Sequence, residues 1–299
     1  MTPQPLRIIW NETAGSKGGI PTDRTSEEEM RALMARHGLG DELVTSSSEE
    51  EARQSAREAV RAGYAAVVAA GGDGSVGLIG TELLGTPTAL GILPMGSVMN
   101  IARMLEIPRE LDPAAAIIAA GQVRAIDVGF HGQEPFYESA SVGMNAAIFK
   151  DVQQADQGDY RGLGRAILTA FRFRPARMVI EMDDETVTTR ALMVTASNGP
   201  YAGAGFTVAP DASLDDGQLD INVFRHFSKL DLIRHFASIA FGRQAYSPHV
   251  RSYRSSQVRI TGHRPLPARA DSRDLGTTPV QFSVHHRTLR VLAPGGAPQ

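Results

Sequence analysis

Residues 64–77 read Tyr-Ala-Ala-Val-Val-Ala-Ala-Gly-Gly-Asp-Gly-Ser-Val-Gly, an apolar run that stops abruptly at a glycine pair. An apolar run of this length bounded by glycine is typical of a buried strand. Glycine lacks a Cβ atom, so Gly71, Gly72 and Gly74 let backbone N–H groups approach an anion closely. A helix that begins at Ser75-Val76-Gly77 adds a favourable dipole. The segment therefore predicts a strand, a phosphate-binding turn and a helix.

Asp73 stands in the middle of this turn, where its charge prevents it from binding phosphate directly. It could instead reach a magnesium ion, the waters of that ion or a nucleotide hydroxyl, which makes it a candidate catalytic residue. The alternative is a tight strand-to-helix turn with a structural aspartate. The glycine, lysine and serine pattern of ordinary P-loops is absent, and so is the three-glycine loop of protein kinases.

Similar patterns flank this segment on both sides. Apolar runs at 6–10 and 86–94 predict further strands that end in loops, and residues 44–45 predict a short one. Thr25-Ser26-Glu27-Glu28 resembles a capping box that opens a helix, and further helices are expected at 49–62 and near 99–105. Strands that alternate with helices at this spacing imply a parallel sheet, which binds ligands at its carboxyl edge.

Strand signals dominate the second half of the chain. They suggest an antiparallel, β-rich second domain, and they fall at 136–142, 177–182, 187–197, 219–224, 250–261 and 280–291. Helices are expected near 161–173 and 229–241. The wide apolar face of the second helix favours core packing, with a membrane-facing surface as the rival interpretation. We place the two domains at 1–128 and 129–299, and the last strand could return to the first domain.

The composition excludes several classes of function. The 299 residues include no cysteine, which excludes disulfides, thiolate metal sites and cysteine nucleophiles. A net charge of −3 gives no general attraction to nucleic acid, so no nucleic-acid partner is expected. No apolar run approaches the roughly 18–20 residues that span a bilayer, and residues 1–7 show no secretory signal. We expect a cytoplasmic protein, with a peripheral location at the membrane as the alternative.

Four short segments follow one another in a recognisable order. They are Asn-Glu-Thr-Ala-Gly-Ser at 11–16, Gly-Gly-Asp-Gly-Ser at 71–75, Leu-Pro-Met-Gly-Ser at 93–97 with Ala102-Arg103, and a stretch at 203–220 that opens with Gly-Ala-Gly-Phe and ends with Asp-Asp-Gly-Gln-Leu-Asp. Together they resemble the diacylglycerol kinase catalytic-domain family, which includes sphingosine kinases and bacterial lipid kinases. The resemblance extends over about residues 6–293. It implies an α/β N-terminal domain with a parallel sheet, like that of NAD kinase and phosphofructokinase, followed by a β-rich C-terminal domain.

The same resemblance implies that ATP and Mg²⁺ are bound, and it marks individual positions for them. Ser75 and Ser97 replace threonines of the family and keep the hydroxyl. The implied magnesium ligands are the Asp216 carboxylate and the backbone carbonyls of Ser213 and Gln218, all hard oxygen donors. Alone, residues 215–217 would favour a hairpin turn, and the order of the four segments reverses that preference. The implied nucleotide contacts are Asn11, Thr13, Gly15, Ser16, Thr45, Gly71, Gly72, Asp73, Gly74, Ser75, Val76, Gly77 and Ser97.

One departure from the family concerns the catalytic base. Relatives carry Asp-Gly-Glu near the C-terminus, and the glutamate is the proposed base that takes the proton of the acceptor hydroxyl. Here residues 271–273 read Asp-Ser-Arg, so Arg273 occupies the glutamate position. Arginine does not act as a base at ordinary pH. Asp271 or Asp274 could serve instead, although neither stands at the usual position.

The resemblance therefore implies a lipid kinase whose acceptor is a diacylglycerol-like or sphingoid alcohol. Such an enzyme implies transient contact with a membrane surface, and a homodimer is possible. Two alternatives stay open. Arg273 is compatible with a catalytically weak or inactive nucleotide- or lipid-binding relative, and the glycine loop alone would also suit a kinase of a soluble alcohol.

Overall fold

The computed structural model divides into two compact units. Met1–Asp127 and Arg287–Gln299 form the first unit, and Val128–His286 forms the second. The residues described are 5–11, 16–17, 20–21, 25–149, 165, 168–170, 172–203, 205–225, 250–295 and 297–298. The helix expected near 229–241, most of the one near 161–173, and the candidate residues Thr13 and Gly15 lie outside them. Among the described helices, none is long and apolar enough to cross a membrane.

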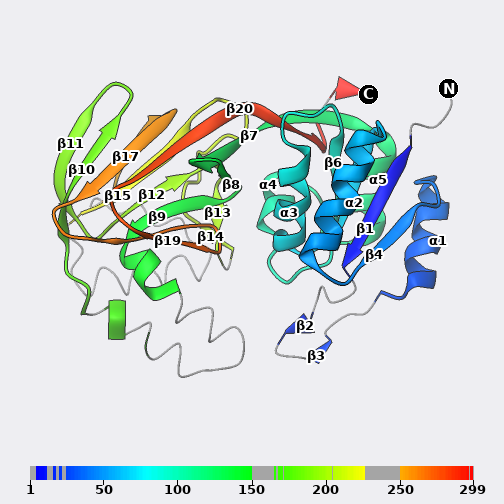
Figure 1. Cartoon of the computed structure of the whole chain (residues 1–299), viewed down its shortest axis with the longest axis horizontal. Coiled ribbons are helices and arrows are strands. Elements are labelled where there is room, and N and C mark those ends of the chain that lie inside the picture. The colour runs from blue at the N-terminus through cyan, green and yellow to red at the C-terminus, as the bar shows by residue number, and fades with distance from the viewer. Residues whose placement is uncertain are drawn as a thin grey trace. The chain divides into compact units, whose positions relative to one another are not determined.

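A parallel sheet forms the centre of the first unit (Figure 1). Neighbouring strands are in register, with Trp10 opposite Ala70 and Gly71 opposite Pro94. The loops that follow Asn11, Gly71 and Pro94 therefore leave the same edge of the sheet. In spatial order the strands are β4 (Leu43–Ser46), β1 (Leu6–Asn11), β5 (Ala66–Gly71) and β6 (Ala89–Pro94), and the end of β20 (Val280–Leu292) lies beside β6.

Helices cover both faces of this sheet (Figure 1). One face carries α1 (Glu27–His37) and α5 (Leu111–Ala120), and the other carries α2 (Glu49–Arg61) and α3 (Asp73–Leu83); α4 (Asn100–Met104) follows β6. The short strands β2 (Ser16–Lys17), β3 (Ile20–Pro21) and β21 (Ala297–Pro298) also belong to this unit. Helix α1 starts at a capping box: Ser26 Oγ accepts the Glu29 N–H at 3.2 Å, and Glu29 Oε2 accepts the Ser26 N–H at 2.7 Å.

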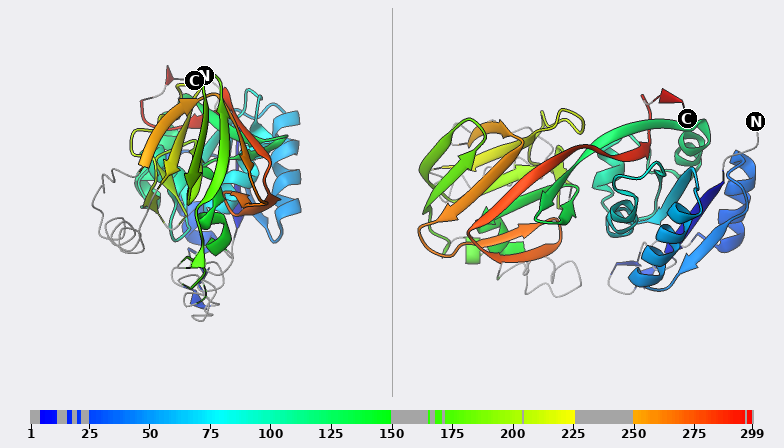
Figure 2. Two further views of the ribbon diagram at one scale, coloured as in Figure 1. Left: turned by 90° about the vertical axis from the view of Figure 1, so that its left-hand side faces the viewer. Right: turned by 45° about the horizontal axis from the view of Figure 1, so that its top comes forward.

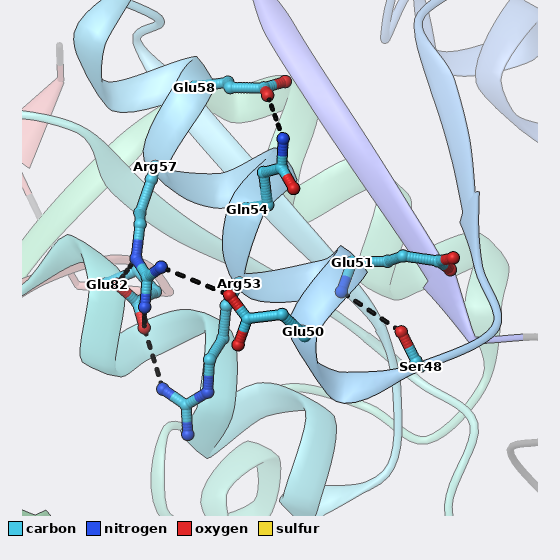
Figure 3. Close-up of polar contacts among 8 residues, drawn as sticks. All are labelled: Ser48, Glu50, Glu51, Arg53, Gln54, Arg57, Glu58 and Glu82. Atoms are coloured by element: carbon cyan, nitrogen blue, oxygen red, sulfur yellow. Dashed lines mark hydrogen bonds and ion pairs between the residues drawn. The ribbon is translucent and has the colours of Figure 1, made fainter.

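Charged side chains join α2 to α3 (Figure 3). Arg53 Nη1 donates to Glu82 Oε1 at 2.8 Å, and Arg57 Nε donates to Glu82 Oε2 at 2.7 Å. Burial works to raise the pKa of the Glu82 carboxyl, but the two arginines outweigh it, and the pKa lies below its usual range. Glu82 thus fixes α3, which begins at the glycine loop, against α2.

The second unit contains two antiparallel sheets (Figure 2). The first consists of β11 (Thr186–Ala191), β10 (Ala176–Met182), β17 (Gln257–Gly262) and β20, with β7 (Gln122–His131) and β8 (Glu134–Phe136) beside them. The second consists, in order, of β16 (Val250–Ser255), β15 (Leu219–Phe224), β12 (Met193–Ser197), β9 (Ser139–Gly143), β18 (Pro267–Ala270) and β19 (Arg273–Thr277). A small hairpin joins β13 (Tyr201–Ala202) to β14 (Phe206–Thr207).

The two sheets of the second unit share one apolar core, so this unit is a β-sandwich. Phe136 and Phe282 meet in its centre with ring centroids 6.0 Å apart at an interplanar angle of 83°. Because side chains alternate along a strand, the six-stranded sheet presents a second face. That face is polar and largely buried, and it carries Ser139, Ser141, Thr195, Ser197, Asp220, Asn222 and Arg269.

Three strands expected as single elements are split in the structure. The run at 250–261 divides into β16 and β17, which belong to different sheets. The break lies at Ser256, whose N–H and hydroxyl donate to Asp183 Oδ2 at 2.6 and 2.7 Å. The runs at 136–142 and 187–197 divide in the same manner, into β8 and β9 and into β11 and β12. An apolar run does not show where a chain changes sheets, because both of its halves reach the same core.

Two strands carry the chain from one unit into the other. β7 leaves the first unit after Asp127, and β20 re-enters it at Arg287. The buried Asp127 carboxylate accepts the Arg287 N–H at 2.7 Å, and Arg287 has a φ of 49°. This hydrogen bond therefore joins Asp127, the last residue before the chain leaves the first unit, to Arg287, the first residue after it returns.

Candidate functional site

The glycine turn is built by close packing of backbone on backbone. β5 ends at Gly71, Gly72 is the N-cap of α3, and the helix begins at Asp73. A Cβ atom on Gly96 would lie 2.7 Å from Gly72 Cα, and one on Gly71 would lie 2.7 Å from Ser75 Cβ. Only glycine fits these two positions. The first N–H groups of α3 have no partner within the helix, so they can donate to an anion.

Asn11 links the first strand to this turn. Its Nδ2 donates to Ser75 Oγ at 3.2 Å. Because the Ser75 oxygen accepts this bond, its own O–H is directed elsewhere and can donate. The structure thus brings Asn11, Gly71, Gly72, Gly74 and Ser75 together at the carboxyl edge of the sheet.

Asp73 holds the next motif in place. Its Oδ2 accepts the Asn100 N–H at 3.0 Å, and its Oδ1 accepts the Ile101 N–H at 2.9 Å. Burial raises the pKa of this carboxyl above its ordinary value, although these N–H donors and Arg109 act in the opposite direction. Asp73 therefore caps the short helix α4. A role toward magnesium or a nucleotide hydroxyl stays a prediction.

A residue that the motifs do not include supports the third loop. Arg109 donates from Nη1 to the Ser97 carbonyl and from Nη2 to the Gly96 carbonyl, both at 3.0 Å. Ser97 itself is exposed, so its hydroxyl is accessible to a ligand. Met99, the residue between this loop and α4, has a φ of 58°.

The remaining nucleotide candidates differ in what they can offer. Val76 is fully buried, so only its backbone can face a ligand. The Gly77 carbonyl accepts the Thr81 hydroxyl at 2.7 Å. Thr45 is exposed on β4, one residue before its end. Ser16 opens β2, and its side chain lies outside the described part of the structure.

In the second unit, the expected magnesium segment surrounds an arginine. Arg254 Nη1 lies 3.4 Å from Asp216 Oδ2, and its Nε lies 3.4 Å from Asp220 Oδ1. Asp216 Oδ1 accepts the Gln218 N–H at 3.0 Å, and Ser213 Oγ donates to Asp215 Oδ1 at 2.7 Å. Burial, with added repulsion from neighbouring aspartates, raises the pKa of the Asp220 carboxyl despite Arg254.

These acids fit a divalent cation in part. Asp220 Oδ2 is buried without a hydrogen-bond partner among the described residues. Two carboxylates face a single guanidinium, which leaves net negative charge for a cation. No described group of three or more histidine, aspartate or glutamate side chains has the arrangement of a metal cage. A magnesium ion here would therefore depend on carbonyls and water, as is common for this ion.

Asp271 occupies a tight turn between β18 and β19, and its carboxylate is fully engaged. Oδ2 accepts the Tyr137 N–H at 2.7 Å, and Oδ1 accepts the N–H groups of Glu138 and Ser139 at 3.0 and 3.1 Å. Asp271 has a φ of 46°. Burial raises the pKa of its carboxyl, while the three N–H donors and Arg269 oppose that rise.

Asp274 and Arg273, both on β19, make different contacts. The exposed Asp274 accepts the Gly276 N–H at 2.8 Å. Arg273 Nη1 donates to Glu134 Oε2 at 2.9 Å, and its Nη2 donates to the Pro135 carbonyl. Arg273 thus ties β19 to β8.

Comparison with known proteins agrees with this geometry in both units. Residues 5–131 match the family model described as the diacylglycerol kinase catalytic domain. Residues 138–293 match the model of the YegS C-terminal NAD kinase β-sandwich-like domain. The chain belongs to the diacylglycerol kinase and YegS family of lipid kinases.

Individual family members cover the chain to different extents. A protein of Chromohalobacter salexigens named "Probable lipid kinase YegS-like" is 35% identical over 184 residues, which is 58% of this chain and 58% of that protein. A protein of Bacillus subtilis named "Diacylglycerol kinase" is 25% identical over 296 residues, 96% of each chain. A crystal structure of a diacylglycerol kinase from Bacillus anthracis superposes with a TM-score of 0.76 at 17% identity, covering 99% of each chain. This last likeness shows the fold.

The structure places one acid that the motifs did not indicate, Glu138, beside Asp271. It lies between Tyr137 and Ser139, whose N–H groups bind Asp271. Its own Oε2 accepts the N–H of Gly203, the first residue of the fourth motif, at 2.8 Å. The sequence signal was weak, because Glu138 stands alone inside an apolar run and its neighbours are distant in sequence.

Proposed function

We propose that this chain is an ATP- and Mg²⁺-dependent lipid kinase that phosphorylates the hydroxyl of a diacylglycerol-like or sphingoid lipid. The observation that carries the proposal is the turn at Gly71–Ser75, which joins three family motifs at one sheet edge through contacts with Asn11, Gly96 and Asn100. The names of the relatives support a lipid acceptor rather than a soluble alcohol.

The first unit holds the donor in this proposal. The open N–H groups at the start of α3 receive the phosphates of ATP, and the hydroxyls of Ser75 and Ser97 donate to its oxygens. Phosphoryl transfer relies mainly on positioning and charge stabilisation, so a rigid backbone cradle contributes much of what is needed. Arg109 and Asp73 keep the third loop next to the glycine turn.

In this proposal, Mg²⁺ binds near the aspartates around Arg254. The Asp216 carboxylate and the carbonyls of Ser213 and Gln218 would hold the ion, and Asp220 Oδ2, which has no hydrogen-bond partner among the described residues, would offer a further oxygen ligand. When bound there, the ion supplies positive charge that offsets the negative charge of the acids and of a phosphorylated ligand.

A carboxylate must accept the proton of the acceptor hydroxyl as its oxygen bonds to the γ-phosphorus and the bond from phosphorus to the β-phosphate oxygen breaks. Asp271 suits this task poorly, since three N–H groups hold its oxygens. We assign the task to Glu138, which is half-buried beside Asp271. Glu138→Gln should lower kcat by about 10²-fold, whereas Asp274→Asn should leave it unchanged. Unaltered turnover in Glu138→Gln would assign the base elsewhere.

A second candidate function follows from Arg273. Its guanidinium is bound to Glu134 and Pro135 where relatives carry a glutamate, which favours a protein that binds nucleotide and lipid with little turnover. That function predicts ATP binding in calorimetry without measurable phosphoryl transfer. Robust turnover by the native chain would remove it.

The test of the kinase uses purified chain, labelled ATP, Mg²⁺ and a total lipid extract. Gly74 is the place for a control, because it is exposed and a Cβ atom there meets nothing within 4 Å. Gly74→Asp adds a negative charge where phosphate should bind, and Gly74→Asn is its neutral match. We expect labelled lipid from the native chain and from Gly74→Asn, and at least about tenfold less from Gly74→Asp. Absence of labelled lipid from the native chain, or equal labelling by Gly74→Asp and Gly74→Asn, contradicts the proposal.

A further inference from the structure

A cavity lined by arginines opens in the second unit. Its volume is about 520 Å³, and we call it the arginine pocket; the residues that line it are Thr169, Arg172, Phe173, Arg174, Pro175, Arg190 and Arg264. All four arginines are exposed to solvent. They come from three separate stretches: the segment before β10, the end of β11 and the loop after β17. The fold therefore gathers charges that are dispersed in the sequence.

The arginine pocket has no carboxylate to balance it in the described part of the chain. None of its four guanidinium groups takes part in an ion pair there. Arg264 donates to the Arg174 carbonyl at 3.1 Å and lies 5.8 Å from the centre of the Phe173 ring. A further exposed arginine, Arg177 on β10, stands directly opposite Arg190 on β11. Like charges opposite each other destabilise a sheet, so this arrangement has a cost that a bound anion would offset.

The chemistry of the pocket indicates which anion it fits. Guanidinium groups bind phosphate with paired N–H donors, and a volume of this size accommodates a small polar group. Next to the pocket, Leu168 precedes Thr169 and is 48% exposed, which is unusual for a large apolar side chain. Basic groups beside an exposed apolar side chain are typical of a surface that contacts lipid headgroups.

We infer that the arginine pocket binds the phosphate headgroup of an anionic lipid, and that it holds the second unit on a membrane surface. The choice of a lipid as the source of the phosphate rests on the proposed lipid kinase function. The pocket itself acts in binding and takes no part in phosphoryl transfer.

Vesicle sedimentation of the full chain, without ATP, tests this inference. The vesicles consist of phosphatidylcholine alone or with about one-third phosphatidylserine. The test variant is Arg172→Gln with Arg190→Gln, because neither side chain makes a hydrogen bond or ion pair among the described residues. The matched control is Arg31→Gln with Arg61→Gln, two exposed arginines of the first unit.

The native chain and the control should bind the anionic vesicles and leave the neutral ones in solution. The pocket variant should bind about 30-fold more weakly, since each basic group near such a surface contributes about fivefold. Equal binding to both kinds of vesicle, or undiminished binding by the pocket variant, overturns the inference. Binding of millimolar glycerol phosphate by a chain that does not bind the anionic vesicles would identify a site for free phosphate esters and overturn the lipid surface.

This outcome is separate from that of the kinase assay. Vesicle binding without transfer would leave the arginine pocket in place and remove the kinase. Transfer to lipid in detergent micelles without vesicle binding would support the kinase and overturn the arginine pocket as a membrane site.

Discussion

An aspartate in each unit performs the same structural task. Asp73 binds two backbone N–H groups of α4, and Asp271 binds three at residues 137–139. The segment held by Asp73 is the start of α4, which follows the loop that contains Gly96 and Ser97. The segment held by Asp271 carries Glu138, the carboxylate that we propose as the base. The same kind of contact thus supports a proposed backbone site in the first unit and a proposed side-chain acid in the second.

The largest expected effect is that of Asp271→Ala. Three buried N–H groups lose their acceptor together, and we expect the free energy of unfolding of the second unit to fall by about 3–5 kcal/mol. Calorimetry would measure this. The control is Asp274→Ala, which removes only an exposed hydrogen bond and should change stability by less than about 0.5 kcal/mol. Equal stability of the two variants would show that Asp271 does not anchor β9.

A somewhat smaller effect is expected at the glycine turn. In Gly96→Val the new Cβ atom collides with the Gly72 backbone, so the two loops must separate, at about 2–3 kcal/mol. Trp10, the single tryptophan, is buried in β1, so its fluorescence reports unfolding of the first unit. Gly74→Ala should be neutral or stabilising by up to about 1 kcal/mol, because its site is open. A stable Gly96→Val would mean that the close packing is dispensable.

Asp73→Ala removes one helix cap and should cost about 1–2 kcal/mol. Its pH dependence has a defined sign. Because burial raises the pKa of Asp73 in the folded chain, its contribution is full below the ordinary carboxyl pKa and is lost as the pH rises through the raised value. The stability advantage of the native chain over Asp73→Asn should therefore be larger near about pH 4 than at pH 7. An advantage that grows with pH would contradict this.

Glu82→Gln should have the smallest effect. It weakens the pairs with Arg53 and Arg57 without creating a cavity, so we expect a loss of about 0.5–1 kcal/mol that shrinks in high salt. Gln54→Ala on the same helix, which removes an exposed contact with Glu58, is the reference. A loss that is unchanged by salt would indicate packing rather than charge.

The sequence predicted the first unit better than the second. Glycines after apolar runs predicted its strands, turns and sheet edge, because these features depend on residues close together in the chain. The splits at Ser256 and after Phe136 were missed, since each depends on an aspartate more than 70 residues away: Asp183 for the first and Asp271 for the second.

The candidate site shows the same limit. Asn11, Gly71 and Ser75 were predicted together and lie together. Arg109 was missed because it binds carbonyls, which leave no mark in a motif. Asp73 matches the family pattern, but the pattern could not reveal that its carboxylate caps a helix 27 residues further along the chain.

The return of β20 to the first unit determines how the protein responds to truncation. The first unit is discontinuous in sequence, because it consists of residues 1–127 and 287–299. Val291, which pairs with Leu90 of β6, is synthesised only after the whole of the second unit. A nascent chain released at residue 127 lacks β20 and the partner of Asp127. Premature termination anywhere in the second half should therefore destabilise the first unit too.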